Sequence, residues 1–162
     1  MLKILIGLIY ATLHGLLKFR NIPQTVTVYG SARLSKESKE YHQAYTLGFK
    51  LAKAGFPVMT GGGPSIMEAA SKGSLDACGQ SYGCNIVLPY EQTANSYMSI
   101  QYETDFFFVR KFLIRHTSTA FIAFPGGFGT LDEIFENITL IRTKSCEAYP
   151  IILVGKEYWK GL

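Results

Sequence analysis

The stretch "TAFIAFPGGFGTLDE", residues 119–133, decides the fold prediction for this chain. It begins with a continuous run of apolar residues, which is typical of a strand buried on both faces of a parallel sheet. Three glycines follow, and they leave the backbone bare for a turn or for the close approach of a ligand. The next residues have a helical pattern, and the first N–H groups of a helix lack intrahelical partners. The stretch therefore predicts a strand, a turn and a helix with an anion site between them.

The same alternation of short apolar runs and helical patterns extends through the chain. The other predicted strands are residues 25–30, 56–63, 82–89, 101–108 and 150–155. Helices are predicted at 38–55, 64–79, 109–118 and 130–144, and the loop from Tyr90 to about Ile100 has no period. This order predicts an α/β fold, a Rossmann-like doubly wound parallel sheet with helices on both faces. We expect residues 21–162 to form a single Rossmann-like nucleotide-binding domain.

Residues 1–20 precede this domain and have the pattern of an amphipathic helix. The run is too short and too interrupted for a membrane span, and no small-residue cleavage site follows it. We therefore expect the helix to pack on the domain or on a partner subunit. Attachment to a membrane surface, or export, is the alternative that we do not favour. The stripe expected to pack consists of Leu2, Leu5, Ile6, Ile9, Leu13, Leu16 and Leu17.

Composition excludes several classes of protein. The net charge of +4 comes without a long run of Lys or Arg, so nucleic acid is not an expected partner, and a pocket for a small anion explains the excess equally well. Three cysteines without CxxC spacing predict a reducing, cytoplasmic location and no disulfide framework. The three histidines are scattered and predict no metal site.

Three glycine-containing turns follow predicted strands, at the edge of a parallel sheet where ligands bind. None has the GxGxxG dinucleotide fingerprint or the GK[ST] of a Walker loop, so we expect a mononucleotide or sugar phosphate. Thr130 is expected to cap the last helix or to add a hydroxyl to the phosphate. The alternative for any one turn is that glycine ends the strand for steric reasons. The candidate binding residues are Gly30, Ser31, Gly61, Gly62, Gly63, Gly126, Gly127, Gly129 and Thr130.

Two pairs of charged residues accompany these turns. Arg110 and Lys111 are predicted at the start of a helix, where the helix dipole disfavours cations, and this placement favours a functional role over a solvated helix start. Asp132 and Glu133 are predicted in the first turn after the glycines, where the dipole alone would explain them. Glu133 shares a helix face with Thr130, so it is the acid expected to point towards a sugar.

Several of these stretches together resemble the sequence blocks of a known family. "PGGFGTLDE" looks like the PGGxGTxxE motif of the LOG (lonely guy) phosphoribohydrolases, often labelled lysine decarboxylases. "VTVYGSAR", "TGGGPSIMEAASKG", "NIVLPYEQ" and "FFFVRKF" resemble its other blocks in the right order, over roughly residues 25–155. The chain departs from the family at Ser65, where a further glycine is common. The added Cβ near the loop is expected to affect how the substrate fits more than whether the protein is active.

The resemblance implies an enzyme that hydrolyses the N-glycosidic bond of a purine nucleoside 5′-monophosphate, either a cytokinin nucleotide or AMP. It implies Arg110 and Glu133 as catalytic residues and the glycine turns as the phosphate site. Lys111, next to Arg110, is expected to position the substrate. The resemblance also implies no cofactor and a homodimer or larger assembly with sites near the subunit interface. A non-catalytic nucleotide-binding or sensing protein is the alternative function. The decarboxylase label finds no support, because no Schiff-base lysine with a partner for the pyridine nitrogen is identifiable.

Overall fold

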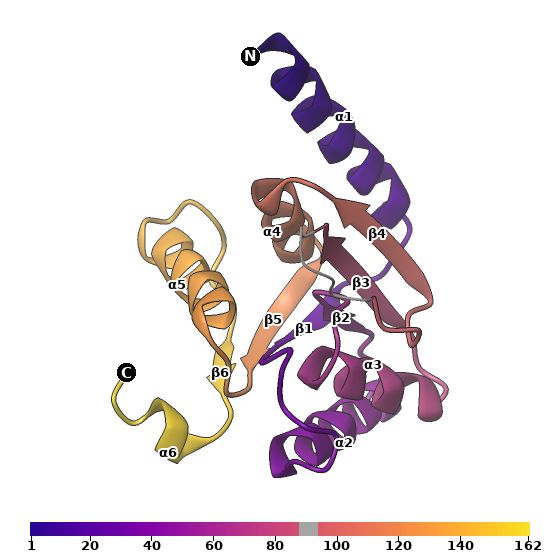
Figure 1. Ribbon diagram of the computed structural model, residues 1–162, viewed down its shortest axis with the longest axis vertical. Coiled ribbons are helices and arrows are strands. Elements are labelled where there is room, and N and C mark those ends of the chain that lie inside the picture. The colour runs from indigo at the N-terminus through magenta and orange to yellow at the C-terminus, as the bar shows by residue number, and fades with distance from the viewer. Residues whose placement is uncertain (88–93) are drawn as a thin grey trace.

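The computed structural model describes residues 1–87 and 94–162, and its centre is one six-stranded sheet with the order β4-β3-β2-β1-β5-β6 (Figure 1). Each neighbouring pair is parallel, for example Val26 opposite Val58 and Val28 opposite Ile122. The predicted α/β parallel sheet is confirmed. The strands are β1 (Thr25–Tyr29), β2 (Val58–Thr60), β3 (Ser81–Ile86), β4 (Ile100–Thr104), β5 (Ser118–Ala123) and β6 (Ile151–Leu153).

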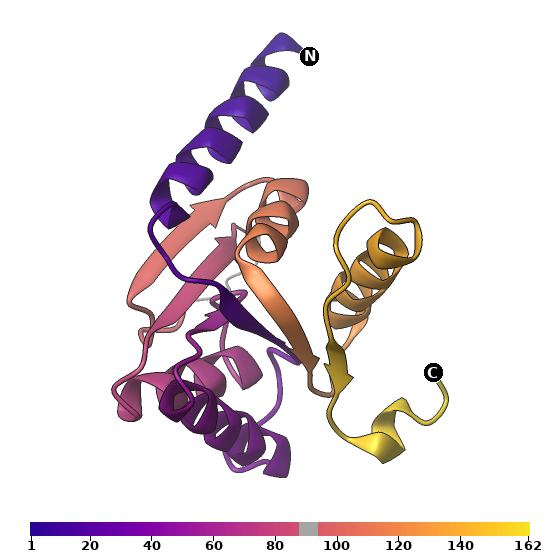
Figure 2. The same ribbon diagram turned by 180° about the vertical axis from the view of Figure 1, so that it is seen from behind.

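Helices cover both faces of the sheet, as a doubly wound fold requires. Two of them, α2 and α3, pack on each other and on the first three strands (Figures 1 and 2). On the other face, α4 packs against β3, β4 and β5, and α1 packs against α4 and β4. The helices are α1 (Leu2–Phe19), α2 (Lys39–Lys53), α3 (Ile66–Asp76), α4 (Phe107–His116), α5 (Phe128–Arg142) and α6 (Lys156–Trp159).

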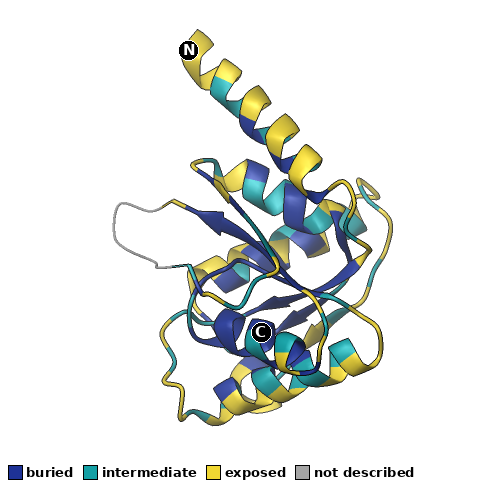
Figure 3. Cartoon of the chain, turned by 90° about the vertical axis from the view of Figure 1, so that its right-hand side faces the viewer, coloured by how far each residue is buried: buried dark blue, intermediate teal, exposed yellow. Residues whose placement is uncertain are grey.

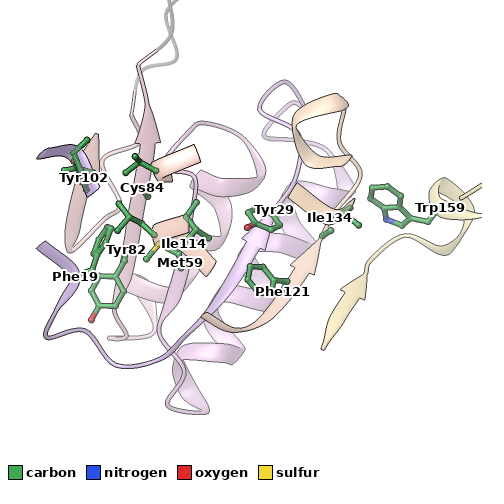
Figure 4. Close-up of a cluster of buried hydrophobic side chains, with 14 residues drawn as sticks. Phe19, Tyr29, Met59, Tyr82, Cys84, Tyr102, Ile114, Phe121, Ile134 and Trp159 are labelled. Carbon is green, nitrogen blue, oxygen red and sulfur yellow. Dashed lines mark hydrogen bonds between the residues drawn. The ribbon is translucent and has the colours of Figure 1, made fainter. Parts of the chain in front are cut away.

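The core has two halves because side chains along a strand alternate between the faces of the sheet. On β5, Phe121 and Ala123 join the cluster formed with α1, α4 and α5, whereas Ile122 joins the cluster under α2 and α3. Figure 4 shows Tyr29 and Phe121 side by side on the first of these faces, near Ile134 of α5. Continuous apolar strands therefore correspond to burial on both faces, as the sequence predicts.

Several predicted boundaries are wrong, and two of these errors affect the charged residues. The fourth strand was expected to run through Phe108, but β4 ends at Thr104 and α4 begins at Phe107. The hydroxyl of Thr104 accepts the N–H of Phe106, which takes that residue out of the ladder and turns the chain. The last long helix begins at Phe128 rather than Thr130, so its first turn contains no acid. The predicted blocks that include residues 88–93 lie partly outside the described residues.

The side of α1 that packs on the domain is not the expected apolar stripe, and packing of that stripe on a partner subunit stays a prediction. Ala11, Gly15 and Phe19 face the domain, and the expected apolar stripe faces away from it, apart from the partly buried Leu16 (Figure 3). Small residues allow the helix to approach: a Cβ on Gly15 would lie 2.2 Å from a methyl carbon of Leu113. By length and composition α1 meets the requirements for a membrane span, with a mean hydropathy of 1.5, so the expectation that it is too short is wrong.

Candidate active site

The candidate site lies where the strand order reverses, between β1 and β5, which is where ligands bind in open parallel sheets. The backbone joins the two loops that leave these strands. The N–H of Phe124 donates to the carbonyl of Tyr29 at 2.9 Å, and the N–H of Ser31 donates to that of Pro125 at 3.0 Å. Gly30 and Ser31 are therefore brought together with the "PGGFG" loop, although nearly a hundred residues separate them.

The loop after β5 leaves donors free at the start of α5. Gly127 is the N-cap of this helix, and no side chain caps it. A Cβ added to Gly127 or to Gly129 would meet nothing within 4 Å, so both face open space. Free N–H groups, the helix dipole and an open approach together suit an anion. Thr130 is not the cap, because it lies inside the helix and is buried with its hydroxyl under Gly126.

The loop after β2 is closed. The N–H and the side-chain amide of Asn95 donate to the carbonyls of Gly62 and Gly63, each at 2.9 Å. Gly62 has a φ of +75°, which favours glycine. A Cβ on Gly61 would lie 2.1 Å from Nη2 of Arg110, so Gly61 makes room for that guanidinium. The start of α3 after this loop has no side-chain cap either. The N–H of Ile66 donates to the carbonyl of Ser31 at 3.2 Å, and the next N–H groups of the first turn lack intrahelical partners at the same edge of the sheet.

Arg110 and Glu133 meet at this edge, from α4 and α5. Nη1 of Arg110 lies 2.7 Å from Oε1 of Glu133, and Nε donates to the carbonyl of Cys84 at 3.0 Å. The two charged side chains are only 12% and 9% exposed. A charge-assisted hydrogen bond at this distance and burial fixes the orientation of both groups. The pair predicted from the sequence is therefore a direct contact in the structure.

Burial sets the electrostatics of the pair. Burial raises the pKa of the Glu133 carboxyl, and the positive charge of Arg110 only partly opposes this effect. For Arg110, burial lowers the pKa, but Glu133 and the neighbouring Tyr29 and Cys84 outweigh it, so that the pKa rises. Burial also raises the pKa of the Cys84 thiol to about 12, so this cysteine stays protonated. The site thus holds a fixed cation beside a carboxylate that takes up a proton more readily than a solvated one.

The charged residues next to this pair, Lys111 of α4 and Asp132 of α5, bind each other instead of joining the pair. Nζ of Lys111 lies 3.0 Å from Asp132 and also contacts Glu136. Asp132 lies in the second turn of the helix, so its partner is this lysine rather than the helix dipole expected from the sequence. The substrate-positioning role of Lys111 stays a prediction.

The sequence analysis did not identify several polar residues that surround the Arg110–Glu133 pair. Asn137 lies one turn after Glu133 and donates its amide to the Glu133 carbonyl at 2.7 Å, while Tyr149 donates to Asn137 at 2.6 Å. The fully buried Tyr29 has its pKa raised well above the ordinary value, first by burial and then by Glu133. The position of Tyr29 directly before Gly30, at the end of a strand, was an available signal. Asn137 and Tyr149 gave no comparable signal.

The arrangement suits chemistry on a phosphorylated sugar. It combines free N–H donors for an anion at the start of α5 with the Glu133 carboxylate in the second turn of that helix. The Arg110 guanidinium contacts this carboxylate. Within residues 1–87 and 94–162, no three His, Cys, Asp or Glu side chains gather closely enough to hold a metal ion. We therefore assign no metal ligands in that part of the chain.

Comparison with known proteins places the chain in a family. Residues 67–162 match the family model described as "Possible lysine decarboxylase". The chain belongs to this family, which is the LOG family. An uncharacterized protein of Archaeoglobus fulgidus is 32% identical over 83% of this chain and 87% of its own length. A cytokinin riboside 5′-monophosphate phosphoribohydrolase of Rhodococcoides fascians is 29% identical over 88% of this chain and 74% of the relative.

Not every relative is covered to that extent. The chain spans 60% of a phosphoribohydrolase of the same name from Mycobacterium tuberculosis, to which it is 31% identical. Among solved structures, a molybdenum cofactor binding protein from Rippkaea orientalis is 26% identical, with a TM-score of 0.62 over 82% of this LOG-family chain and 77% of the other. A Moco carrier protein from Chlamydomonas reinhardtii, at 24% identity and a TM-score of 0.65 over 86% and 82%, shares the fold.

Proposed function

We propose that the chain hydrolyses the N-glycosidic bond of purine nucleoside 5′-monophosphates, releasing the free base and ribose 5-phosphate. The observation that carries this proposal is the buried 2.7 Å contact between Arg110 and Glu133, beside the uncapped start of α5. A pure phosphate-binding loop needs no buried carboxylate, which a phosphate would repel. The names of the curated relatives support the same reaction class.

The residues divide the reaction among them. The 5′-phosphate binds the N–H groups at the start of α5, which places the sugar towards the second turn of that helix. Glycosidic cleavage develops positive charge at C1′, and the Glu133 carboxylate stabilises that charge, holds the ribose hydroxyls or orients the attacking water. The base leaves with negative charge, which the Arg110 guanidinium offsets. Binding of the phosphate, remote from C1′, positions the reacting bond.

Release of free base from AMP and from isopentenyl-AMP tests the proposal. The wild-type chain should release base from at least one of them, and Glu133→Gln should lower the rate by about 100-fold to 1,000-fold, the loss typical of removing one stabilising group. Gln keeps the shape and a hydrogen-bonding oxygen, so it limits the cost of leaving Arg110 buried without its ion-pair partner. Asp132→Asn is the matched control, since the adjacent carboxylate is 56% exposed and binds Lys111. If no purine monophosphate yields base, or Glu133→Gln retains full activity, the proposal is wrong.

A non-catalytic binding protein is the second candidate function. It is favoured by the likeness to the molybdenum cofactor binding protein, which has the same fold at 26% identity. Under this alternative the glycine loops bind a phosphorylated ligand and Arg110–Glu133 only closes the site. Equilibrium binding of AMP without any release of base, unchanged in Glu133→Gln, would favour it over the hydrolase.

A further inference from the structure

An apolar face of α1 points away from the rest of the molecule. Figure 1 shows the N-terminal end of α1 extending beyond α4 and β4. The side chains on the far face recur every three or four residues, as on one side of a helix. All of them are between 51% and 71% exposed: Leu2, Ile6, Ile9, Leu13 and Leu17. A contiguous apolar face of this extent marks an interaction surface.

The second half of the helix is fixed to the domain. The hydroxyl of Tyr102 donates to the carbonyl of Ala11 at 2.7 Å, and the ring of Phe19 packs edge-on against Tyr102. Domain contacts begin at Gly7, which lies against Phe106, and at Leu8, which packs on the core cluster. Only Leu2–Ile6 extends freely, which is roughly 8 Å at the rise of an α-helix and well under half of the ~30 Å hydrocarbon core of a bilayer. While α1 is docked in this way, it can enter a membrane surface but cannot cross the membrane.

Apart from Lys3, the first two turns are apolar on every side. Ile4 lies on the same side of the helix as Ala11, yet it is 66% exposed because the domain does not reach it, and Leu5 is 52% exposed on a further side. One partner helix lying along the far face would leave Ile4 and Leu5 in water. A lipid phase would surround all of these side chains.

The charges around this face are complementary to an anionic surface. Residues 1–24, which comprise α1 and the link to β1, contain three cations, Lys3, Lys18 and Arg20, and no Asp or Glu. Lys3 and Lys18 are both exposed on α1, near its two ends. Long cationic side chains at the ends of an apolar helix reach the headgroups while the apolar face enters the acyl region.

We propose that α1 binds the surface of an anionic lipid bilayer, with its N-terminal turns inserted and the domain held on the aqueous side. This inference is independent of the proposed hydrolase activity. It is an alternative to the expectation that the apolar stripe packs on a partner subunit.

Flotation of the full chain with vesicles tests the proposal. The chain should float with phosphatidylcholine vesicles that contain phosphatidylserine, less with phosphatidylcholine alone, and less at high salt. Ile6→Glu/Ile9→Glu should reduce binding by more than about tenfold, because two charges enter the inserted face. Phe135→Glu/Ile138→Glu is the matched control, with the same change at exposed apolar residues three apart on α5, and should bind as the wild type does. Ile6→Leu/Ile9→Leu should also retain binding.

Three results would overturn the proposal. The wild-type chain could fail to float with either vesicle, or the two glutamate variants could bind equally. Light scattering could also detect a wild-type oligomer that does not float and that Ile6→Glu/Ile9→Glu dissociates. The far face of α1 would then bind a second copy of the chain instead of lipid.

Discussion

The two glycine loops at the edge of the sheet have similar sequences and different tasks. In the loop after β2, Asn95 binds the carbonyls of Gly62 and Gly63, and Gly61 lies against Arg110. In the loop after β5, Gly127 and Gly129 face open space. Glycine is therefore required in the first loop by the protein itself. In the second loop the protein requires it at Gly126, which lies on Thr130, whereas the ligand that we propose requires it at Gly127 and Gly129. The sequence motif alone does not distinguish these two reasons.

Among substitutions in the two glycine loops, the largest expected effect comes from breaking the closed loop. In Gly61→Ala, the new Cβ would lie 2.1 Å from Nη2 of Arg110, whose other nitrogens are held by Glu133 and Cys84. The guanidinium must shift, and a displacement of this size near the reacting bond typically costs about 100-fold in rate. We expect kcat for release of base to fall by that factor. A variant with an unchanged kcat and only a raised KM would contradict this account of Gly61.

The second prediction concerns the pH dependence of activity and of stability. It tests the Arg110–Glu133 pair, against which Gly61 of the closed loop lies. Because burial raises the pKa of Glu133 above its ordinary value of 4.5, the carboxylate is lost at a higher pH than in a solvated glutamate. If the carboxylate is the active form, kcat/KM should fall about tenfold per pH unit below that raised pKa. Stability has the opposite dependence. Since the folded protein binds the proton more tightly, rising pH between the ordinary and the raised pKa lowers the free energy of unfolding.

A pH–rate profile measured together with thermal unfolding checks both directions. Asp132→Asn should leave the profile unchanged, because that carboxylate is more than half exposed and pairs with Lys111. An acid limb at the ordinary glutamate pKa would show that Glu133 is not the group that titrates.

The open loop should respond differently. In Gly129→Ala the Cβ meets no protein atom within 4 Å, so the fold and Arg110 stay in place. The methyl group instead occupies the space where we expect the phosphate, so KM should rise by about tenfold with little change in kcat, the signature of lost uniform binding. Steady-state kinetics on AMP separates the two parameters. Equal effects on kcat in Gly61→Ala and Gly129→Ala would remove the distinction between the loops.

How well the sequence predicts each part of this site depends on how far apart along the chain the interacting residues lie. Strand–glycine–helix order is local, so the parallel sheet and the two loops were predictable from apolar runs and turn residues. The contact between Arg110 and Glu133 was suggested by their positions at the sheet edge and by the family resemblance. What the sequence did not predict is non-local, namely Asn95 on the closed loop and the Tyr149–Asn137 bond behind Glu133. These contacts depend on crossovers that no periodic pattern encodes.

The sequence did not predict which side of α1 packs on the domain, for a related reason. Periodicity identifies an apolar stripe, but it does not state what the stripe faces. The domain contacts the side of the helix with Ala11 and Gly15, because small residues allow close approach to Leu113 and Tyr102. The larger apolar side chains are left for another partner.

The smallest expected effect concerns Ser65, which ends the closed loop. Ser65 has φ 60° and ψ −119°, a backbone region that side chains other than glycine rarely adopt, and its hydroxyl donates to the carbonyl of Leu34 at 2.9 Å. Ser65→Gly removes the strain and the hydrogen bond together. Since such strain costs of order 1–3 kcal/mol and one hydrogen bond contributes about 1 kcal/mol, we expect a net gain of about 1 kcal/mol.

Ser74→Gly on α3 separates the two contributions. Its hydroxyl makes an equivalent bond of 2.9 Å to the carbonyl of Gln80, but its backbone is helical, so the substitution loses the bond, adds the entropic cost of glycine in a helix and relieves no strain. Thermal unfolding should shift up by about 2–4 °C in Ser65→Gly, as expected for 1 kcal/mol in a chain of this size, and down in Ser74→Gly. If both variants lose stability, the hydrogen bond to Leu34 outweighs the strain at Ser65. Serine would then be the better residue for this loop.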